Sequence, residues 1–377
     1  MHLCGDFAKQ QIYTQLVTHL AGTGVPQVVY AAVRTKDEAA WMPPELANVP
    51  CHLRHILRGR HRVLFRSKVR CVARDVADQV DLSEIVLTHA HFLYSDGAVA
   101  LTLKRRFGVP FIVAVRNTDI NAFMRYRPDL SRVRDAILAE AARVVFLSHA
   151  YERLLGQHLD ADLRSRVEAK TAIIPNGVRQ DWLDSPPPLP RPAQPELGLL
   201  YVGDFSRNKN VPALLEAAAT LCRTRRLRLT LVGGGGDGAE TVERLLASGR
   251  YPFATHVGRV NDATALRTIY REHDIFVMVS IHETFGVVYA EALSQGLPIV
   301  HSRGQGVDGY FAPSSVAEAA DPCDPADIAA RIEAVAGRLP AVRPQCVLEA
   351  GRFDWGRIAR TYADLYGAVT REAGVRH

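Results

Sequence analysis

The sequence predicts an α/β protein built from two doubly wound domains, and three observations lead to this prediction. Apolar, strand-like runs alternate with helix-like segments along residues 1–184, a proline-rich segment interrupts them, and the alternation restarts at Leu197. Strands that alternate with helices pair in parallel through right-handed crossovers. The chain has 377 residues, of which 47% are hydrophobic and 23% charged, so it is long enough for two hydrophobic cores.

Residues 1–184 are predicted to form the first domain. Helices are expected over 8–21 and 96–107, and the opening strand is short, which leaves open a start farther upstream. The expected strands are Met1–Cys4, Gln27–Val33, Glu84–His91, Pro110–Val115, Arg143–Ser148 and Ala172–Val178.

Residues 185–196 are predicted to be an extended linker, because their many prolines cannot continue a helix or a central strand. Residues 197–355 then form the second domain, with a helix expected over 211–223. Its strands are expected at Leu197–Val202, Leu227–Val232, Asp274–Val279 and Pro298–His301. The glycine run 233–236 favours a flexible turn over a dinucleotide fingerprint, since a clear helix start does not follow it.

Composition excludes several classes of protein. No run approaches ~20 apolar residues, and the N-terminus lacks the layout of a signal peptide, so we expect a cytoplasmic protein. The six cysteines are scattered, with no Cys-x-x-Cys pair and no histidines at ligand spacing, which predicts reduced thiols and no metal site.

The excess charge of +6 lies in residues 1–185, which hold 25 Lys and Arg against 19 Asp and Glu. Arg54–Arg74 contains eight cations, no acidic residue and several interleaved apolar residues. Such a basic run suits an anionic membrane surface, although a solvated helix face or a nucleic-acid patch has the same composition. We expect peripheral contact with the inner face of a membrane and no nucleic-acid partner.

The most informative segment is Ser280–Pro298, which follows a buried strand. Thr284 is a plausible N-cap, and Gly286 lets a ligand approach the free amides of the next helix. A diphosphate fits such a helix start. With a helix beginning near Phe285, Glu291 lies roughly 9 Å along its axis, while Glu283 stays in the loop. One carboxylate on each side of a diphosphate could accept vicinal hydroxyls, as in a nucleotide sugar.

These residues resemble the retaining glycosyltransferases of family 4, which have the GT-B architecture of two Rossmann-like domains facing a central cleft. Glu283 and Glu291 match the family's Glu-x7-Glu motif, inside Glu-Thr-Phe-Gly-x-x-x-x-Glu-Ala. Further resemblance comes from Ile174–Val178, from the loop Tyr201–Asn210, and from Phe353–Trp355 before a closing helix. The resemblance implies that this helix, 356–377, packs back on the first domain.

The resemblance also implies roles for single residues. Lys209 matches the diphosphate-binding lysine, with Arg207 close enough to assist. Glu291 would hold the ribose and Glu283 the transferred sugar. Backbone close to the donor is expected at Gly5, Gly203, Thr284, Phe285, Gly286 and Val287. Asp204 replaces the usual arginine after Gly203, so we expect it to turn away from the phosphates.

A second departure concerns Arg116, which stands where the family often has a histidine that contacts the donor sugar. It can donate a hydrogen bond to a hydroxyl or a phosphate but cannot act as a base. The alternative is a structural arginine salt-bridged to Asp119. His89 and His91, at a strand end, are candidates for the cleft or the core, and 305–308 form a candidate cleft loop.

The resemblance implies transfer of a hexosyl unit, with retention and without a required metal or other cofactor, from a nucleotide diphosphate sugar. UDP is slightly favoured over GDP. The expected acceptor is a hydroxyl of a glycan or lipid-linked glycan in cell-surface polysaccharide synthesis. The alternatives are a sugar-nucleotide epimerase of the same fold and a non-catalytic two-domain sugar-binding protein. A nicotinamide-dependent dehydrogenase would need a proper glycine fingerprint.

Overall fold

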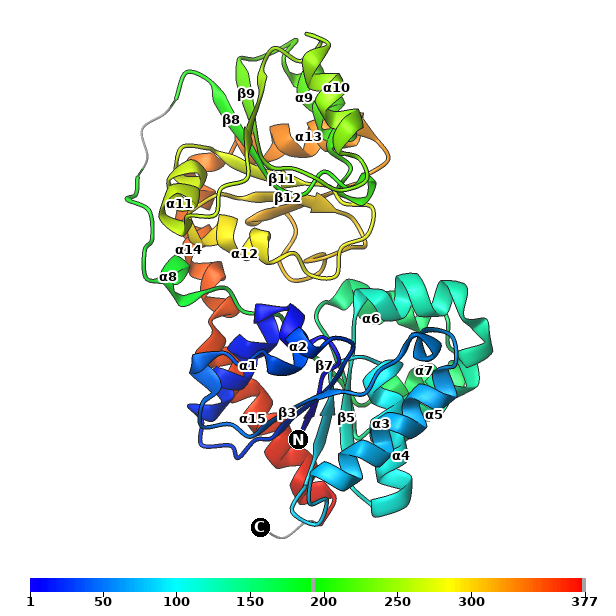
Figure 1. The fold of residues 1–377 in the computed structure, drawn as a ribbon. Coiled ribbons are helices and arrows are strands. Elements are labelled where there is room, and N and C mark those ends of the chain that lie inside the picture. The colour runs from blue at the N-terminus through cyan, green and yellow to red at the C-terminus, as the bar shows by residue number, and fades with distance from the viewer. Residues whose placement is uncertain (191–193, 375–377) are drawn as a thin grey trace. The chain divides into compact units, whose positions relative to one another are not determined.

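A computed structural model describes residues 1–190 and 194–374, which form two compact units (Figure 1). The first unit comprises residues 1–147, 151–176 and 355–377, and the second comprises 148–150 and 177–354. Residues 177–184, predicted at the end of the first domain, therefore belong to the second unit. The predicted linker 185–196 includes 191–193, which lie outside the described residues.

The first unit contains a seven-stranded sheet in the order β3-β2-β1-β4-β5-β6-β7, with every pair parallel. Two-sided burial explains the apolar runs, because in β5 Val113 and Val115 join the core on one face while Ile112 and Ala114 join the core on the other. The strands are β1 His2–Leu3, β2 Val29–Val33, β3 Cys51–His55, β4 Thr88–Ala90, β5 Phe111–Val115, β6 Arg143–Phe146 and β7 Thr171–Ile173.

Helices cover both faces of this sheet. The last helix, α15 Trp355–Glu372, lies beside α1 and shares a core with it through Leu16, Leu20, Ile358 and Tyr362 (Figure 1). The C-terminal helix thus packs on the first unit. The other helices are α1 Gln11–Ala21, α2 Lys36–Ala40, α3 Phe65–Gln79, α4 Ser95–Phe107, α5 Ser131–Glu140, α6 His149–Gly156 and α7 Ala161–Glu168.

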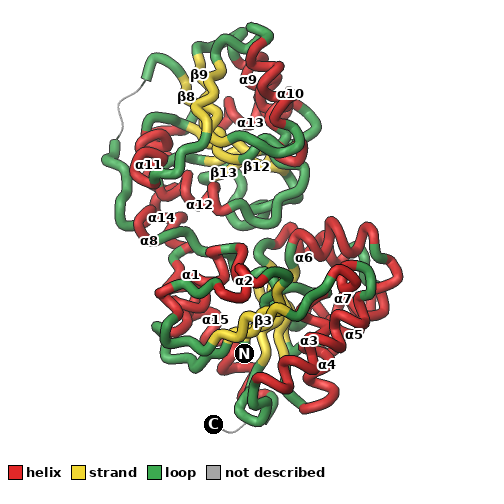
Figure 2. Tube along the Cα trace, in the orientation of Figure 1, coloured by secondary structure: helices red, strands yellow, loops and turns green. Residues whose placement is uncertain are grey.

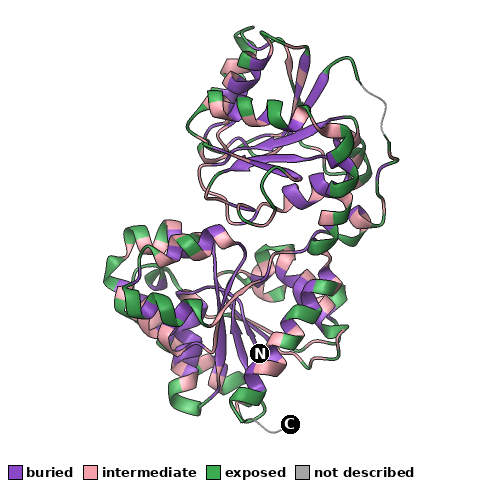
Figure 3. Cartoon of the chain, turned by 180° about the vertical axis from the view of Figure 1, so that it is seen from behind, coloured by how far each residue is buried: buried purple, intermediate pink, exposed green. Residues whose placement is uncertain are grey.

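The second unit contains a six-stranded parallel sheet in the order β10-β9-β8-β11-β12-β13 (Figure 2). The strands are β8 Leu197–Gly203, β9 Leu227–Gly233, β10 Ala254–Gly258, β11 Ile275–Met278, β12 Ile299–Ser302 and β13 Ala317–Ala320. The helices are α8 Gln180–Leu183, α9 Val211–Leu221, α10 Ala239–Ala247, α11 Ala263–Arg271, α12 Val287–Ser294, α13 Pro325–Ala336 and α14 Leu339–Ala350. The predicted α/β class with two doubly wound units is confirmed, and Figure 3 shows central strands buried in each unit.

The basic run Arg54–Arg74 is not one helix. It begins in β3, an edge strand that the sequence analysis missed, continues through the 3-10 helix η3 Gly59–Arg62, and enters α3. The polar residues His52, Arg54 and His55 give β3 no apolar run, which is why its composition hid the strand. No helix in the described part of the chain is long and apolar enough to cross a bilayer.

Gly233 ends β9, and the glycines 234–236 begin the turn that follows it, as predicted. The expectation that no helix start follows the run is wrong, because α10 begins at Ala239. All four glycines have positive φ angles. A Cβ on Gly233 would lie 1.8 Å from the carbonyl oxygen of Gly203, and one on Gly236 would lie 2.6 Å from the amide nitrogen of Ser206. The glycines therefore let this turn pack directly against the loop that follows β8.

Candidate functional site

The loops after β8 and β11 bring together the two charged residues that the sequence singles out. Lys209 Nζ lies 2.7 Å from Glu283 Oε2, and the two side chains are 20% and 12% exposed. Lys209 ends the 3-10 helix η6 Arg207–Lys209, and Glu283 precedes α12. Because β8 and β11 are parallel neighbours, the loops at their carboxyl ends meet at one edge of the sheet. The fold thus places the two opposite charges in direct contact.

Asn208 fixes the two loops to each other. Its amide nitrogen donates to the carbonyl of His282 at 2.9 Å, and its side-chain oxygen accepts from the amide of His282 at 2.9 Å. Asn210, in a left-handed conformation with φ of 56°, donates to the carbonyls of Val279 and Pro322. The backbone that carries Lys209 is therefore held on both sides by side-chain amides, which limits the movement of its side chain.

The helix α12 begins at Val287, and its N-cap is Gly286 rather than Thr284, so the predicted Thr284 cap is wrong. Gly286 has a φ of 78°, and a Cβ there would lie 2.6 Å from the ring of Tyr289. The buried Tyr289 donates its hydroxyl to the carbonyl of Met278 at 2.7 Å, and its amide donates to the carbonyl of Gly286 at 3.0 Å. Gly286 has no side chain to cap α12, so within the described residues the helix start has no side-chain cap. Phe285 is buried beside this turn.

Glu291 lies in the middle of α12. Because the helix begins at Val287, Glu291 is roughly 6 Å along the axis from the helix start, instead of the predicted ~9 Å. The hydroxyl of Tyr270, on α11, donates to Glu291 Oε2 at 3.2 Å. Burial raises the pKa of Glu291 to about 7, although Tyr270 and the more distant Arg179 oppose this shift. In the ligand-free chain this carboxyl group is therefore partly protonated at neutral pH.

The loop after Gly203 carries further positive charge. Arg207 is exposed, and its amide donates to Asp237 at 2.9 Å. The carboxylate of Asp204 accepts from the Ser206 amide at 2.8 Å within its own loop, and its turning away from the phosphates stays a prediction. Partial burial opposes ionisation of Asp204, but Ser206, Lys209 and Arg259 together lower its pKa. Sequence reasoning missed Arg259, whose guanidinium donates to the carbonyl of Gly234 at 3.0 Å in the glycine turn.

The loop after β12 lies at the same edge of the second sheet as the loops after β8 and β11. Gln305 accepts a hydrogen bond from the amide of Glu283 at 3.1 Å, and the amide of Gly306 donates to the carbonyl of Glu283 at 2.7 Å. Val307 is buried, and Asp308 accepts from the amide of Gly304 at 2.8 Å. The candidate loop 305–308 thus lies directly against Glu283 and holds its backbone.

A second polar site lies in the first unit, at the carboxyl ends of β1, β2 and β4. It is a pocket of about 210 Å³ whose lining includes Gly5, Lys9, Arg34, Lys68 and Asp96. The amide of Gly5 donates to Asp96 at 3.4 Å. Burial raises the pKa of Asp96 to about 7, with Lys68 acting in the opposite direction. Apart from Gly5, these residues were not predicted to belong to a binding site. The one signal in the sequence is Asp96, an acidic residue in the first turn of a helix that follows a strand.

Arg116 is buried among aromatic rings. Its Nε donates to the carbonyl of His91 at 3.2 Å, and its guanidinium lies 5.8 Å from the ring centre of Tyr13. Asp119 accepts hydrogen bonds from the backbone amides of Leu93, Tyr94 and Arg116, not from the guanidinium. The alternative of a salt bridge to Asp119 is therefore wrong. A catalytic role for Arg116 stays a prediction.

The sequence is similar to those of known glycosyltransferases. A family model described as glycosyl transferases group 1 matches residues 190–336. D-inositol 3-phosphate glycosyltransferase of Geodermatophilus obscurus is 28% identical over 98% of this chain and 86% of its own length. The protein of that name from an Arthrobacter species is 26% identical over 97% of this chain and 91% of its own length.

Solved structures are similar to the chain as a whole. Sucrose-phosphate synthase from Thermosynechococcus elongatus has a TM-score of 0.72 at 22% identity and covers 98% of both chains. Anabaena Alr3699/HepE in complex with UDP has a TM-score of 0.70 at 16% identity, over 97% of this chain and 99% of its own. At such identities the structures show a shared fold, and the likeness covers both units.

Proposed function

We propose, from the premise that this chain is a GT4-type glycosyltransferase with the GT-B fold, that it moves a hexosyl unit from a nucleotide diphosphate sugar to an acceptor hydroxyl. The observation that carries the proposal is the preformed pair of Lys209 and Glu283 beside the uncapped start of α12. A cation and free amides suit a diphosphate, and a carboxylate suits sugar hydroxyls. A sugar joined to a diphosphate would satisfy both.

In this proposal Lys209 and the first amides of α12 neutralise the diphosphate as it departs, where negative charge develops. Glu283, released from Lys209, accepts hydroxyls of the transferred sugar, and Glu291 accepts the ribose hydroxyls. The acceptor hydroxyl attacks from the face that the diphosphate leaves, giving retention, and a phosphate oxygen takes its proton. Lys209 supplies charge that a metal ion would otherwise provide, so we propose that the step needs none.

We favour UDP as the nucleotide, because the similar Anabaena protein was solved with UDP, with UDP and glucose, and with UDP-glucose. The deciding experiment is a thermal-shift screen with UDP, GDP, ADP and CMP, followed by their sugar conjugates. A ligand present at 100 times its Kd stabilises a protein by ~2.7 kcal/mol. Stabilisation by GDP alone would reverse the choice of base, and stabilisation by none would contradict the donor site.

Analysis of the reaction products distinguishes a transferase from the two alternatives, an epimerase and a non-catalytic sugar-binding protein. A labelled nucleotide sugar should give a glycoside of the acceptor, whereas an epimerase would give an isomeric nucleotide sugar and a binding protein would give neither. Glu291→Ala should weaken binding of the free nucleotide, while Glu283→Ala should mainly lower turnover. Equal loss of nucleotide affinity in both variants would refute the division of roles.

For the acceptor, we propose a small anionic polyol bound in the pocket of the first unit. Lys9, Arg34 and Lys68 line this pocket and suit a phosphate group, while Asp96 can accept a hydroxyl. The matching relatives are named for D-inositol 3-phosphate, a compound of that kind. Lys68→Met should raise the KM for a phosphorylated polyol, such as an inositol phosphate, and leave the KM for the donor unchanged. An unchanged acceptor KM would exclude this pocket.

A lipid-linked glycan of cell-surface polysaccharide synthesis is the second candidate acceptor, favoured by one observation. Val63 and Leu64 are 73% and 54% exposed, and the neighbouring Arg60, Arg62 and Arg66 are exposed too. Apolar side chains among cations suit an anionic membrane surface at which such an acceptor would lie. Co-sedimentation with anionic vesicles should then fall as salt rises, and fall further after Arg62 and Arg66 are changed to Ser. Wild type that stays in the supernatant at low salt would reject this candidate.

A further inference from the structure

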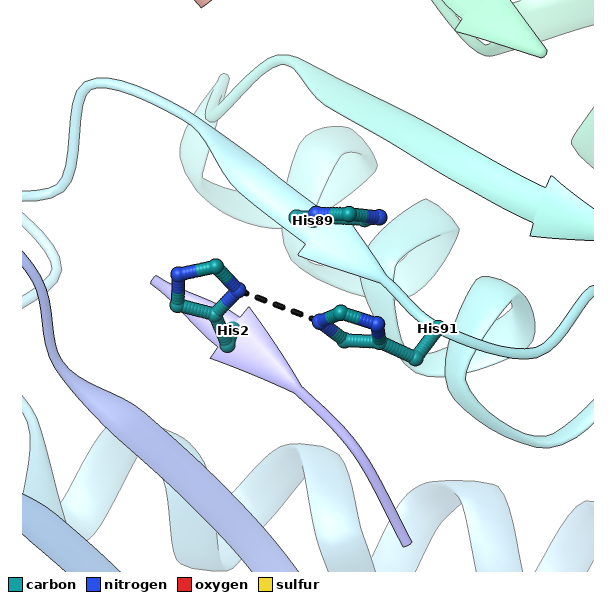
Figure 4. A group of neighbouring side chains, drawn as sticks. All are labelled: His2, His89 and His91. Carbon is teal, nitrogen blue, oxygen red and sulfur yellow. Dashed lines mark hydrogen bonds between the residues drawn. The ribbon is translucent and has the colours of Figure 1, made fainter. Parts of the chain in front are cut away.

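Three buried histidines lie together in the sheet of the first unit. His2 on β1 is the register partner of His89 on β4, so the two side chains point to the same face of the sheet. His91 comes two residues after His89 and lies on that face as well (Figure 4). All three are 3% exposed or less. No metal site was expected, since the scattered cysteines have no histidines at ligand spacing. His2 is far from His89 and His91 in sequence, and strand pairing joins them.

The hydrogen bonds around the cluster fix which nitrogen of His2 carries a proton. The side-chain oxygen of Gln27 lies 2.9 Å from His2 Nε2, while its amide nitrogen donates to the carbonyl of Val17. Gln27 therefore accepts a hydrogen bond from the Nε2–H of His2, which leaves a lone pair on His2 Nδ1. This Nδ1 lies 3.1 Å from His91 Nε2 (Figure 4). Two nitrogens on one tetrahedral Zn²⁺ are separated by roughly 3.3 Å, so the spacing suits a shared ion.

The outer contacts suit metal ligands as well. The hydroxyl of Tyr366 lies 2.7 Å from His89 Nδ1, which leaves His89 Nε2 as the ligand atom. Ligand histidines ordinarily donate their other ring N–H to an oxygen atom, and Gln27 and Tyr366 provide such oxygens for His2 and His89. Burial lowers the pKa of His2 to about 3 and holds the pKa values of His89 and His91 well below their usual range.

Two nitrogen atoms in the cluster have no partner within the described residues. His89 Nε2 and His91 Nδ1 are both buried and make no hydrogen bond there. An ion bound by His2 Nδ1, His91 Nε2 and His89 Nε2 would give the unpartnered His89 Nε2 a partner, while His91 Nδ1 would stay as it is. A neighbouring pocket of about 630 Å³, lined in part by His2, Gln27, His89 and Tyr366, offers a path of entry.

We propose that His2, His89 and His91 bind one divalent transition-metal ion, Zn²⁺ in the first place, at a structural site that ties β1 to β4. One ligand atom from each residue already lies within 4.8 Å of the others. The ligand nitrogens of a tetrahedral Zn²⁺ are roughly 3.3 Å apart, so the more distant ligand atoms must move closer when an ion binds. The fourth position is open to water or to a ligand from the pocket.

This site is separate from Lys209 and Glu283 and takes no part in the proposed transfer. A bound ion would affect the position of Arg116, because the carbonyl of His91 accepts a hydrogen bond from the guanidinium of Arg116. An ion on His91 would stiffen the end of β4 next to that arginine. Failure of the metal proposal would therefore leave the donor site untouched.

The test is metal binding by the full-length, untagged protein after treatment with a chelator. Wild type should take up one Zn²⁺ or Co²⁺ per chain, with the visible spectrum of Co²⁺ bound by nitrogen ligands, and Zn²⁺ should raise its Tm reversibly. His89→Gln should lose this binding, whereas His55→Gln and His158→Gln, which change exposed histidines of the same unit, should keep it. Tyr366→Phe, which removes only the outer oxygen, should weaken binding by roughly 10–100-fold.

Equal metal uptake by wild type and the folded His89→Gln variant would overturn the proposal, as would wild type that binds no Co²⁺. If His89→Gln fails to fold, the wild-type measurements decide. A Co²⁺ spectrum that Zn²⁺ displaces supports the site, and a Tm that Zn²⁺ leaves unchanged contradicts it.

Discussion

Lys209 and Glu283 form an ion pair, and both side chains are partly open to solvent. A ligand can therefore exchange places with either partner without creating a buried, unpaired charge, which would be costly. In the proposed function, a diphosphate replaces Glu283 as the partner of Lys209, and hydroxyls of the sugar replace Lys209 as the partners of Glu283. The ion pair keeps the ammonium group of Lys209 and the carboxylate of Glu283 in position for the ligand.

Lys209→Ala should lower kcat/KM by roughly 10²–10³, the effect typical of a lost electrostatic stabiliser. Affinity for a nucleoside without phosphates should not change, because the lysine acts on the diphosphate. Steady-state kinetics and calorimetry measure the two effects, with Lys36→Ala in the exposed first turn of α2 as the matched control. Near-normal turnover of the Lys209 variant would refute its role.

Glu291 should make donor binding depend on pH. Burial raises its pKa to about 7 in the free chain, and the ionised form is the one that accepts two ribose hydroxyls. Affinity for a nucleotide sugar should therefore rise with pH, by roughly tenfold between pH 6 and pH 8. Glu291→Gln should bind more weakly at pH 8 and show little dependence on pH. A wild-type affinity that is flat across this range would contradict the assignment.

At the scale of the element, the start of α12 depends on one backbone position. The positive φ of Gly286 turns the chain from the Glu283 loop into the helix, and the ring of Tyr289 occupies the space where a Cβ would lie. Sequence reasoning placed the helix start near Thr284 because threonine is a good N-cap. It could not foresee that a buried tyrosine three residues after the glycine would pack against this turn.

Gly286→Ala should lower both stability and nucleotide affinity, since the new Cβ meets the Tyr289 ring at 2.6 Å and the φ of 78° adds strain. Gly249→Ala is the control, because Gly249 has a φ of 73° and nothing within 4 Å of a Cβ. The strain alone costs about 1–2 kcal/mol, and the clash should add to it in the Gly286 variant only. Thermal unfolding of both variants measures this. An equal loss of Tm would show that the ring contact does not matter.

At the scale of the whole molecule, alternation of apolar strands and helices was enough to predict two parallel sheets. The Glu-x7-Glu pattern pointed to Glu283 and the loop resemblance pointed to Lys209, and the structure brings the two side chains into contact. Their roles stay predictions. The edge strand β3 was missed because its side chains are largely polar and basic. The pocket of Lys68 and Asp96 was missed because only the packing of α3 beside α4 brings them together. The histidine cluster was missed for a similar reason, since it depends on the register of β1 and β4.

The most direct test of the central claim is a crystal structure with a bound UDP-sugar. The account predicts that the diphosphate lies at the first turn of α12, with an oxygen within about 4 Å of Lys209 Nζ. The sugar should contact Glu283, and the ribose hydroxyls should contact Glu291. A diphosphate seated elsewhere, for instance in the turn of 233–236 with the ion pair of Lys209 and Glu283 intact, would contradict it.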